Sequence, residues 1–340
     1  MVYGKALMSM KKIILTGLFL VLAGAGCRES GRWYHEVRDL YYGIPIQVRY
    51  YPEDAQLSKQ VWAYLESIDD VFNDYKAGSE ISAINRRNAT GDVTLSPMLA
   101  DAFGKAQQAW QFSEGVFDVT CAPIRNLWKQ AAKQGAVPSD AEVAAVRERC
   151  GLNRIELNGN RLTILKAGLQ FDFGGIVKGM IADHVIEMLK AGGAQSALVQ
   201  IGGETAAFGL SQKKKPFQIG IQHPEQRAGV WGVIQDPGTG LSTSTSGNYE
   251  NPIRINGQVF YHIVDPRTGY PAKTQTMSVS IAFPQTGKNW LADALSTTGV
   301  LLGPEKTFAI VKSFGGGAMF LVKQNGEIRE IDSPEWEKFK

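Results

Sequence analysis

The sequence contains few of the side chains that hold structural metal ions. It has three cysteines and four histidines among its 340 residues. Zinc sites use cysteine and histidine ligands at short, regular spacings, and no such spacing occurs here. The histidines are scattered along the chain at His35, His184, His223 and His262. The sequence therefore gives no indication of a zinc site.

An excess of charge of one sign is also lacking. Lys and Arg total 36 and Asp and Glu total 33, for a net charge of +3. The densest basic run, Lys213–Lys215, is followed by Pro216 and is typical of a solvated turn. A nucleic-acid-binding surface is not indicated. With 44% apolar and 20% charged residues, the composition is that of a globular protein.

Repeats and the common phosphate-binding loops are absent as well. Neither G-x-x-x-x-G-K-[ST] nor G-x-G-x-x-G occurs in the sequence, and there is no low-complexity tract. These absences exclude a P-loop and the usual dinucleotide-binding fingerprint.

The N-terminus has no apolar run long enough to span a membrane, but it resembles an export signal. Lys11 and Lys12 precede an uncharged run over residues 13–25, the length of the apolar region of a signal. Because the run closes on LAGAGC, we expect residues 1–27 to be the signal and Cys27 to be lipidated. A cleaved signal that leaves a free Cys27 thiol is the alternative. Lipidation would anchor the protein on the periplasmic side of the bacterial inner membrane.

The two remaining cysteines are an even pair in a chain that we expect to be exported. Disulfides persist in such compartments, so Cys121 and Cys150 could form one. Two buried thiols are the favoured alternative, because Cys121 follows the apolar stretch VFDVT and Cys150 lies at a helix end.

Helices are predicted in several places. Apolar residues between Val61 and Phe72 recur at the spacing of one helical face, which predicts a helix over residues 54–73. A second is predicted over 96–113. A third is predicted from Ser139, which forms a capping-box pattern with Glu142, to Gly151.

Asparagine–glycine pairs predict β-hairpins. Asn158–Gly159 stands between RIEL and RLTIL, Asn256–Gly257 stands between PIRI and VFYHIV, and YYGIPIQVRYY alternates as a strand does. Frequent hairpins favour an α+β fold with mixed or antiparallel sheets and packed helices. We expect residues 28–340 to form the functional domain, with two lobes that could meet near residue 195.

The stretch LQFDFGGIVKG suggests an anion site. LQFDF predicts a strand, and residues 176–190 have the apolar spacing of a helix that ends at Gly192 and Gly193. Free amide groups at a helix start, with Lys178 beside them, would bind an anion such as phosphate. Alternatively, the glycines only allow close packing of helix on strand, and Lys178 is solvated.

A second helix carries an acid on an apolar face. In NWLADALSTTGVLLG, Asp293 and Thr297 are four residues apart and so lie on one side of the helix. A buried acid is costly unless it is paired or binds a cation. Carboxylate, hydroxyl and carbonyl oxygens suit Mg²⁺ better than zinc.

Seven motifs in order give the chain a family resemblance. They are FNDYKAGSEISAIN, GVFDVT, DFGGIVKGMIAD, IGGE, STSGNYE, HIVDPRTGYP and ADALST. This series resembles the bacterial ApbE family, the FAD:protein FMN transferases, over roughly residues 40 to 325. The resemblance implies an ApbE-like fold and an enzyme in which a Ser or Thr hydroxyl of an acceptor protein attacks the FMN phosphorus of FAD, so that AMP leaves.

The resemblance also implies roles for individual residues. Mg²⁺ would be held by Asp293, Thr297 and the backbone carbonyl of Gly175, and His262 would be the base that takes the proton of the acceptor hydroxyl. The residues expected to contact FAD are Tyr42, Tyr75, Val116, Phe117, Asp118, Asp172, Lys178 and Ser296. The sequence departs from the family where YYG replaces the common Met-Gly-Thr. The acceptor would be an exported or membrane protein with a Ser/Thr flavinylation motif, such as a redox-pump subunit.

Two other functions remain open from the sequence. A related enzyme could let water attack FAD, which would give free FMN and AMP. A flavin-binding lipoprotein without catalysis is the other alternative, but it leaves the acid of ADALST without a role.

Overall fold

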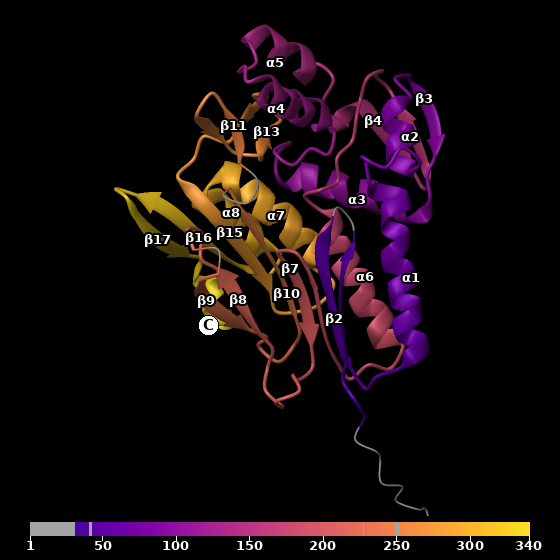
Figure 1. Cartoon of the computed structure of the whole chain (residues 1–340), viewed down its shortest axis with the longest axis vertical. Helices are drawn as coiled ribbons and strands as arrows, with labels where there is room; N and C mark the ends of the chain where they lie inside the picture. The colour runs from indigo at the N-terminus through magenta and orange to yellow at the C-terminus, as the bar shows by residue number, and fades with distance from the viewer. Residues whose placement is uncertain (1–30, 41–42, 227, 249–251) are drawn as a thin grey trace, which may run out of the picture. The chain divides into compact units, whose positions relative to one another are not determined.

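One antiparallel sheet runs through the protein (Figure 1). The computed structural model describes residues 31–40, 43–226, 228–248 and 252–340. Within these ranges the sheet has eight strands in the order β1-β2-β6-β7-β10-β15-β16-β17, and each neighbouring pair is antiparallel. The strands are β1 (Tyr34–Leu40), β2 (Ile44–Tyr51), β6 (Ser196–Ile201), β7 (Glu204–Phe208), β10 (Leu241–Gly247), β15 (Thr276–Phe283), β16 (Gly317–Gln324) and β17 (Glu327–Asp332). The predicted α+β fold is confirmed.

Helices cover the sheet, as Figure 1 shows for α6 and α7. Helix α6 (Val177–Ala191) packs on β6 and β7, and α7 (Asn289–Leu302) packs on β10, β15 and α6. Helices α1 (Ala55–Phe72) and α3 (Pro97–Phe112) add a further layer, since α1 contacts α6 and α3 contacts α7. The largest apolar core lies among α1, α3, α6, β2 and β6.

Smaller elements complete the described fold. A three-stranded sheet has the order β3 (Gly91–Thr94), β5 (Arg161–Ile164), β4 (Ile155–Asn158). Three separate hairpins pair β8 (Gln218–Gln222) with β9 (Val230–Gln235), β11 (Ile253–Ile255) with β12 (Gln258–Phe260), and β13 (Val264–Asp265) with β14 (Tyr270–Pro271). The other helices are α2 (Glu80–Arg86), α4 (Ala122–Gln134), α5 (Asp140–Arg147) and α8 (Pro304–Ser313), with 3₁₀ turns at Leu152–Arg154 and Pro334–Phe339.

The helices predicted from local patterns are confirmed. The ranges 54–73, 96–113 and 176–190 correspond to α1, α3 and α6. The capping box before α5 is present: the Glu142 N–H donates to Ser139 Oγ (3.3 Å), and the Ser139 N–H donates to Glu142 Oε2 (2.8 Å). Helix α5 ends at Arg147, earlier than the predicted Gly151.

Both predicted hairpins are confirmed. Asn256 and Gly257 have φ angles of +49° and +79° between β11 and β12, the positive values that this turn needs. In the other hairpin, Asn158 pairs with Arg161, so the two turn residues are Gly159 and Asn160, one position later than predicted.

The prediction that LQFDF is a strand is wrong. The segment makes one isolated bridge, between Gln170 and Cys121. The backbone of Phe171 bonds instead to the Asn85 side chain, with Phe171 N–H donating to Oδ1 (2.7 Å) and Asn85 Nδ2 donating to Phe171 O (2.9 Å). A side-chain amide thus replaces the neighbouring strand that the apolar pattern suggested.

Residues Arg32–Lys340 form one compact unit. Strands from before and after residue 195 share the large sheet, so any two lobes meeting there, as predicted, would share that sheet. Cys121 and Cys150 are free thiols. Over the part of the chain that is described, no helix combines the length and apolar character needed to cross a membrane. The predicted signal and Cys27 lie outside the described residues.

Candidate active site

The close packing of α6 against α7 sets the geometry of the site. A Cβ added at Gly179 would lie 2.2 Å from the backbone oxygen of Asn289, so only glycine fits at this position of α6. One turn further on, Asp183 accepts hydrogen bonds from the N–H groups of Asn289 (2.9 Å) and Trp290 (3.0 Å). These groups belong to the first turn of α7, which has no partners within its own helix. Gly179 and Asp183 therefore fix the start of α7 on α6.

A buried cluster of charges joins α6, α7 and β7. Lys178 Nζ lies 3.3 Å from Asp293 Oδ1 and 3.4 Å from Glu204 Oε1, and it donates to the Gly174 carbonyl at 2.8 Å. The Gly179 N–H donates to Asp293 Oδ2 at 3.1 Å. Asp293 is 1% exposed and Glu204 is 2% exposed. One ammonium therefore faces two buried carboxylates.

The cluster carries an excess of acceptors. Burial raises the pKa of Glu204 above its ordinary range; Lys178 opposes this shift and Asp293 adds to it. Burial by itself would lower the pKa of Lys178, but the two carboxylates outweigh it and raise the pKa. Glu204 Oε2 is buried without a hydrogen-bond partner. A further positive charge at this place would offset the surplus.

Thr297 and Gly175, two of the predicted metal ligands, lie next to each other beside this cluster. Thr297 lies one turn after Asp293 on α7, and a Cβ added at Gly175 would lie 3.4 Å from Thr297 Oγ1. Among the described residues, no group of three or more His, Cys, Asp or Glu side chains is placed to share an ion. A cation here would therefore use hydroxyl and carbonyl oxygens beside the Asp293 carboxylate. Such a donor set fits a hard cation such as Mg²⁺.

His262 lies between β12 and β13, where the charge of Lys178 acts on its imidazole ring. The pKa of His262 is lowered to about 4, mainly by burial; Lys178 and Lys129 contribute in the same direction, and Asp172 opposes them. Its Nδ1 atom is buried without a hydrogen-bond partner. The imidazole is therefore neutral at pH 7, the form that can accept a proton, but a pKa of about 4 makes it a weaker base than a group whose pKa lies near the operating pH.

Asp172 is held by an arginine that the sequence analysis did not single out. Arg125, near the start of α4, donates through Nη1 to Asp172 Oδ2 and through Nη2 to Asp74. The Gly174 N–H donates to the other Asp172 oxygen at 2.9 Å. These contacts shape the turn that leads into α6 and Lys178.

The remaining predicted FAD contacts lie in different surroundings. Phe117 is next to Gly175, with Cε2 3.3 Å from a Cβ added there. Val116 is buried, and both oxygens of Asp118 accept bonds from the protein, from Thr120 and from the Leu152 N–H (3.1 Å). Tyr75 is 66% exposed with Lys129 against its ring. Tyr42 lies outside the described residues. Ser296 has no exposed surface and lies within hydrogen-bond distance of Ser244 and Ser246. The cofactor contacts of all these residues stay predictions.

The comparison with known proteins identifies the family. The sequence pattern of the ApbE family matches residues 42–321. The chain belongs to the ApbE family. The chain is 27% identical to a FAD:protein FMN transferase of Vibrio cholerae over 96% of this chain and 98% of that protein. It is 28% identical to one of Treponema pallidum over 89% of each chain.

Solved structures of ApbE proteins have the same fold. The flavin transferase ApbE of Vibrio cholerae superposes with a TM-score of 0.79 at 26% identity, over 91% of this chain and 99% of that chain. The apo form of the flavinyl transferase ApbE of Pseudomonas stutzeri has a TM-score of 0.77 at 27% identity, over 90% and 96%.

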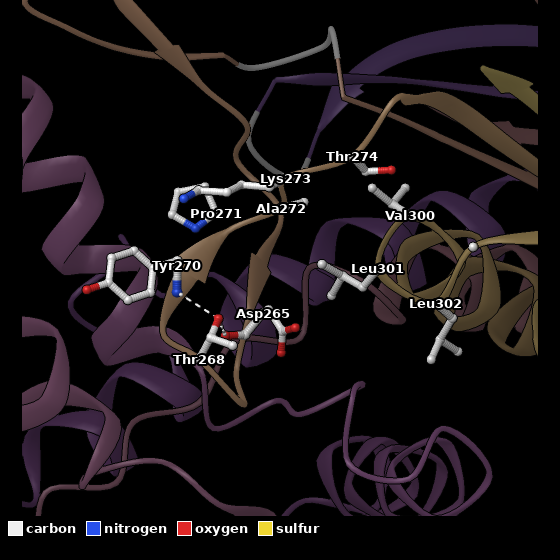
Figure 2. A pocket seen from close by; sticks show the side chains of 11 residues that line it. Asp265, Thr268, Tyr270, Pro271, Ala272, Lys273, Thr274, Val300, Leu301 and Leu302 are labelled. Atoms are coloured by element: carbon white, nitrogen blue, oxygen red, sulfur yellow. Dashed lines mark hydrogen bonds between the residues drawn. The ribbon is translucent and has the colours of Figure 1, made fainter. Parts of the chain in front are cut away.

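Two cavities of this ApbE-family chain flank the β13–β14 hairpin that follows His262. Figure 2 shows the first, of about 430 Å³, between that hairpin and the end of α7 at Val300–Leu302. The second, of about 660 Å³, is lined by residues that include Trp128, Tyr261 and Lys273. None of the predicted site residues lines either cavity. The charge cluster and the predicted metal ligands are therefore not part of these two cavities.

Sequence reasoning missed the acid at the centre of this ApbE site. Glu204 is part of the IGGE motif, but its partners Lys178 and Ser244 come from distant segments. One signal in the sequence was available: Glu204 is the first residue of the buried strand β7. A buried acid needs a partner, which is the reasoning that singled out Asp293.

Proposed function

We propose that this chain transfers FMN from FAD to a Ser or Thr hydroxyl of an acceptor protein, with release of AMP. Membership of the ApbE family and the activities by which its relatives are named support the reaction. The observation that carries it is the buried Lys178–Asp293–Glu204 cluster beside Thr297, which offers a cation and phosphates one site.

The proposed cation is Mg²⁺. The fit of the donor set supports it: the Asp293 carboxylate, the Thr297 hydroxyl and the main-chain carbonyl of Gly175 are hard oxygen donors. When bound, Mg²⁺ would neutralise charge on the pyrophosphate of FAD. Asp293 is held by the Gly179 N–H and by Lys178, whose Nζ lies 3.3 Å from each carboxylate oxygen, so an ion here would share the carboxylate with the ammonium group.

The proton of the acceptor hydroxyl goes to His262. The hydroxyl oxygen forms a bond to the FMN phosphorus, the bond from that phosphorus to the AMP oxygen breaks, and AMP leaves with the electron pair. The neutral His262 ring accepts the proton at Nε2, because Nδ1 is buried out of reach of the acceptor hydroxyl. Lys178 contributes positive charge for the phosphates at the start of α6, where the N–H groups of Val177 and Gly179 already donate to Phe173 O and Asp293.

We also propose that the protein is exported and anchored by a lipid on Cys27. The apolar run over residues 13–25 that ends in LAGAGC supports this location. Wild-type protein should then fractionate with membranes, whereas Cys27→Ser should be soluble or unprocessed. Wild-type protein in the soluble periplasmic fraction would contradict the anchor.

The reaction is tested by incubating the purified protein with FAD and Mg²⁺, with and without an acceptor domain that carries a Ser/Thr flavinylation motif. Transfer predicts AMP and covalent flavin fluorescence that both depend on the acceptor. AMP with free FMN in the absence of acceptor would indicate hydrolysis of FAD. Bound FAD without AMP would indicate a flavin-binding protein and would rule out catalysis.

A further inference from the structure

A chain of hydroxyl groups connects Glu204 to Thr297. Glu204 Oε1 lies 3.2 Å from Ser244 Oγ, and Ser244 Oγ lies 3.0 Å from Ser296 Oγ. Ser296 Oγ lies 2.8 Å from Ser246 Oγ, and Ser246 Oγ lies 3.2 Å from Thr297 Oγ1. Ser244 and Ser296 have no exposed surface. Bulk water therefore does not compete for their protons, and the direction of each hydrogen bond follows from the groups themselves.

The first contact has a fixed direction. Glu204 Oε1 lies 3.4 Å from Lys178 Nζ as well as 3.2 Å from Ser244 Oγ. An ammonium group can only donate, so Oε1 acts as an acceptor. Ser244 has one hydroxyl proton, and that proton points to Glu204.

The other directions follow from counting protons. Because the Ser244 proton is used, the contact between Ser244 and Ser296 requires the Ser296 proton. Ser296 Oγ has two other acceptors nearby, the Asp293 carbonyl at 3.0 Å and Ser246 Oγ at 2.8 Å. All four contacts of the chain hold a proton only if the Ser296 proton goes to Ser244, and Ser246 then donates to Ser296. Thr297 then donates to Ser246, because the Ser246 proton is also used.

We propose that Glu204, through Ser244, Ser296 and Ser246, orients the Thr297 hydroxyl so that its lone pairs face the cation. The proposal rests on the proposed function, in which Thr297 is a cation ligand. A neutral hydroxyl binds a cation through its oxygen, with its proton directed elsewhere, and the chain supplies an acceptor for that proton. Groups that orient metal ligands typically change metal affinity by about 10- to 100-fold. Glu204, Ser246 and Ser296 are thus positioning residues.

The test is the affinity of the purified full-length protein for Mn²⁺ alone, measured from the electron paramagnetic resonance signal of free Mn²⁺. Ser246→Ala removes the acceptor of the Thr297 proton. Ser296→Ala removes the acceptor of the Ser246 proton, which can then turn toward Thr297. Each variant should bind Mn²⁺ about 10-fold or more weakly, and Ser246→Thr, which keeps a hydroxyl, should bind as the wild type does.

The matched control is Ser280→Ala. Ser280 is buried on β15 and shares a 2.8 Å hydrogen bond with Thr245, outside the chain that ends at Thr297. This variant loses the same kind of bond but should bind Mn²⁺ with wild-type affinity. Thermal unfolding of each variant checks that it is folded.

The possible results separate this proposal from the function on which it rests. Wild-type affinity in Ser296→Ala would overturn the proposed orientation of Thr297 but not the cation site, because the chain from Glu204 reaches Ser246 through Ser296. Equal weakening in Ser280→Ala would also overturn it, as a general packing effect. A wild-type protein that binds no Mn²⁺ would overturn the proposed cation site together with this inference.

Discussion

At the scale of residues, the site depends on one lysine between two buried acids. Opposite charges at the 3.3–3.4 Å separations of Lys178 from Asp293 and Glu204 attract strongly when water is excluded. The lysine neutralises only one of the two carboxylates if both are ionised. A divalent cation beside Asp293 would change the local balance from negative to positive, which suits a pyrophosphate.

Asp293→Asn should abolish Mg²⁺-dependent cleavage of FAD. The amide keeps a hydrogen-bond acceptor for the Gly179 N–H but removes the anionic ligand, so we expect a loss of about 100-fold or more in rate. AMP release at saturating FAD measures it. Asp101→Asn on α3 is the control, because Asp101 is an exposed partner of Lys105. Full activity in Asp293→Asn would rule out the metal assignment.

His262→Ala should bind FAD in the presence of Mg²⁺ and fail in transfer. General bases typically contribute about 10²- to 10⁴-fold, so labelling of the acceptor in a single turnover should slow by at least about 10²-fold. His184→Ala, which alters an exposed histidine stacked on Tyr64, should leave labelling unchanged. Unchanged labelling in His262→Ala would make His262 structural, and a collapse of FAD affinity would make it a binding residue.

The lowered pKa of His262 also predicts a pH dependence of stability. Burial, with the charges of Lys178 and Lys129, lowers its pKa from 6.5 to about 4, so between these values the unfolded chain binds more protons than the folded one. The contribution of His262 to the free energy of unfolding should therefore rise with pH from about 4 to about 6.5 and level off above, with a slope up to about 1.4 kcal/mol per pH unit. Urea unfolding of wild type and His262→Gln across this range isolates the contribution. Parallel curves for the two proteins would contradict it.

At the scale of elements, the contact between α6 and α7 holds Lys178 and Asp293 in register. Gly179 allows the approach and Asp183 receives the first N–H groups of α7. Burial raises the pKa of Asp183 to about 7, the cost of placing a capping carboxylate inside the protein. Displacing one helix would separate the two halves of the charge cluster.

Gly179→Ala should destabilise the protein and weaken metal binding together. The added Cβ would lie 2.2 Å from Asn289 O, and backbone must move to relieve the clash. We expect a loss of about 3 kcal/mol in the free energy of unfolding, measured by urea denaturation. Gly104→Ala is the matched control on α3, where a Cβ meets nothing within 4 Å and should add about 0.4–1 kcal/mol. A stable Gly179→Ala variant would show that the contact is not tight.

Elements with local signals are predictable from the sequence, and those that depend on distant partners are not. The Ser139–Glu142 capping box and the Asn256–Gly257 turn each depend on residues within four positions. LQFDF looks like a strand, but Asn85, 86 positions before Phe171, takes the place of a strand partner. The spacing of apolar residues does not predict a contact between a side chain and a backbone so far apart in the sequence.

The candidate site divides in the same way. The four-residue spacing of Asp293 and Thr297 places them on one helix face, and the motif around Lys178 suggests an anion site from its residue types alone. The roles of Glu204 and Arg125 could not be predicted from the sequence, because both depend on partner residues that only the fold brings close. Glu204 meets Lys178 and Ser244 across three separate segments.

At the scale of the whole described unit, the order of strands in the large sheet brings the site residues together. Neighbouring strands β7 and β10 carry Glu204 and two serines of the hydroxyl chain, and α6 and α7 lie against these strands. Ser244 meets Glu204 and Ser296, which are 40 and 52 positions away from it in the sequence. The site is therefore a property of the whole sheet and cannot be moved to a fragment.

The most direct test of the central claim is the fate of the FMN group in a single turnover. The wild-type protein, FAD, Mg²⁺ and an acceptor domain are mixed, and intact mass and AMP are measured together. We predict that the acceptor gains the mass of one FMN group on a Ser or Thr, in an amount equal to the AMP released. An acceptor of unchanged mass, with AMP and free FMN in solution, would contradict the proposed transfer.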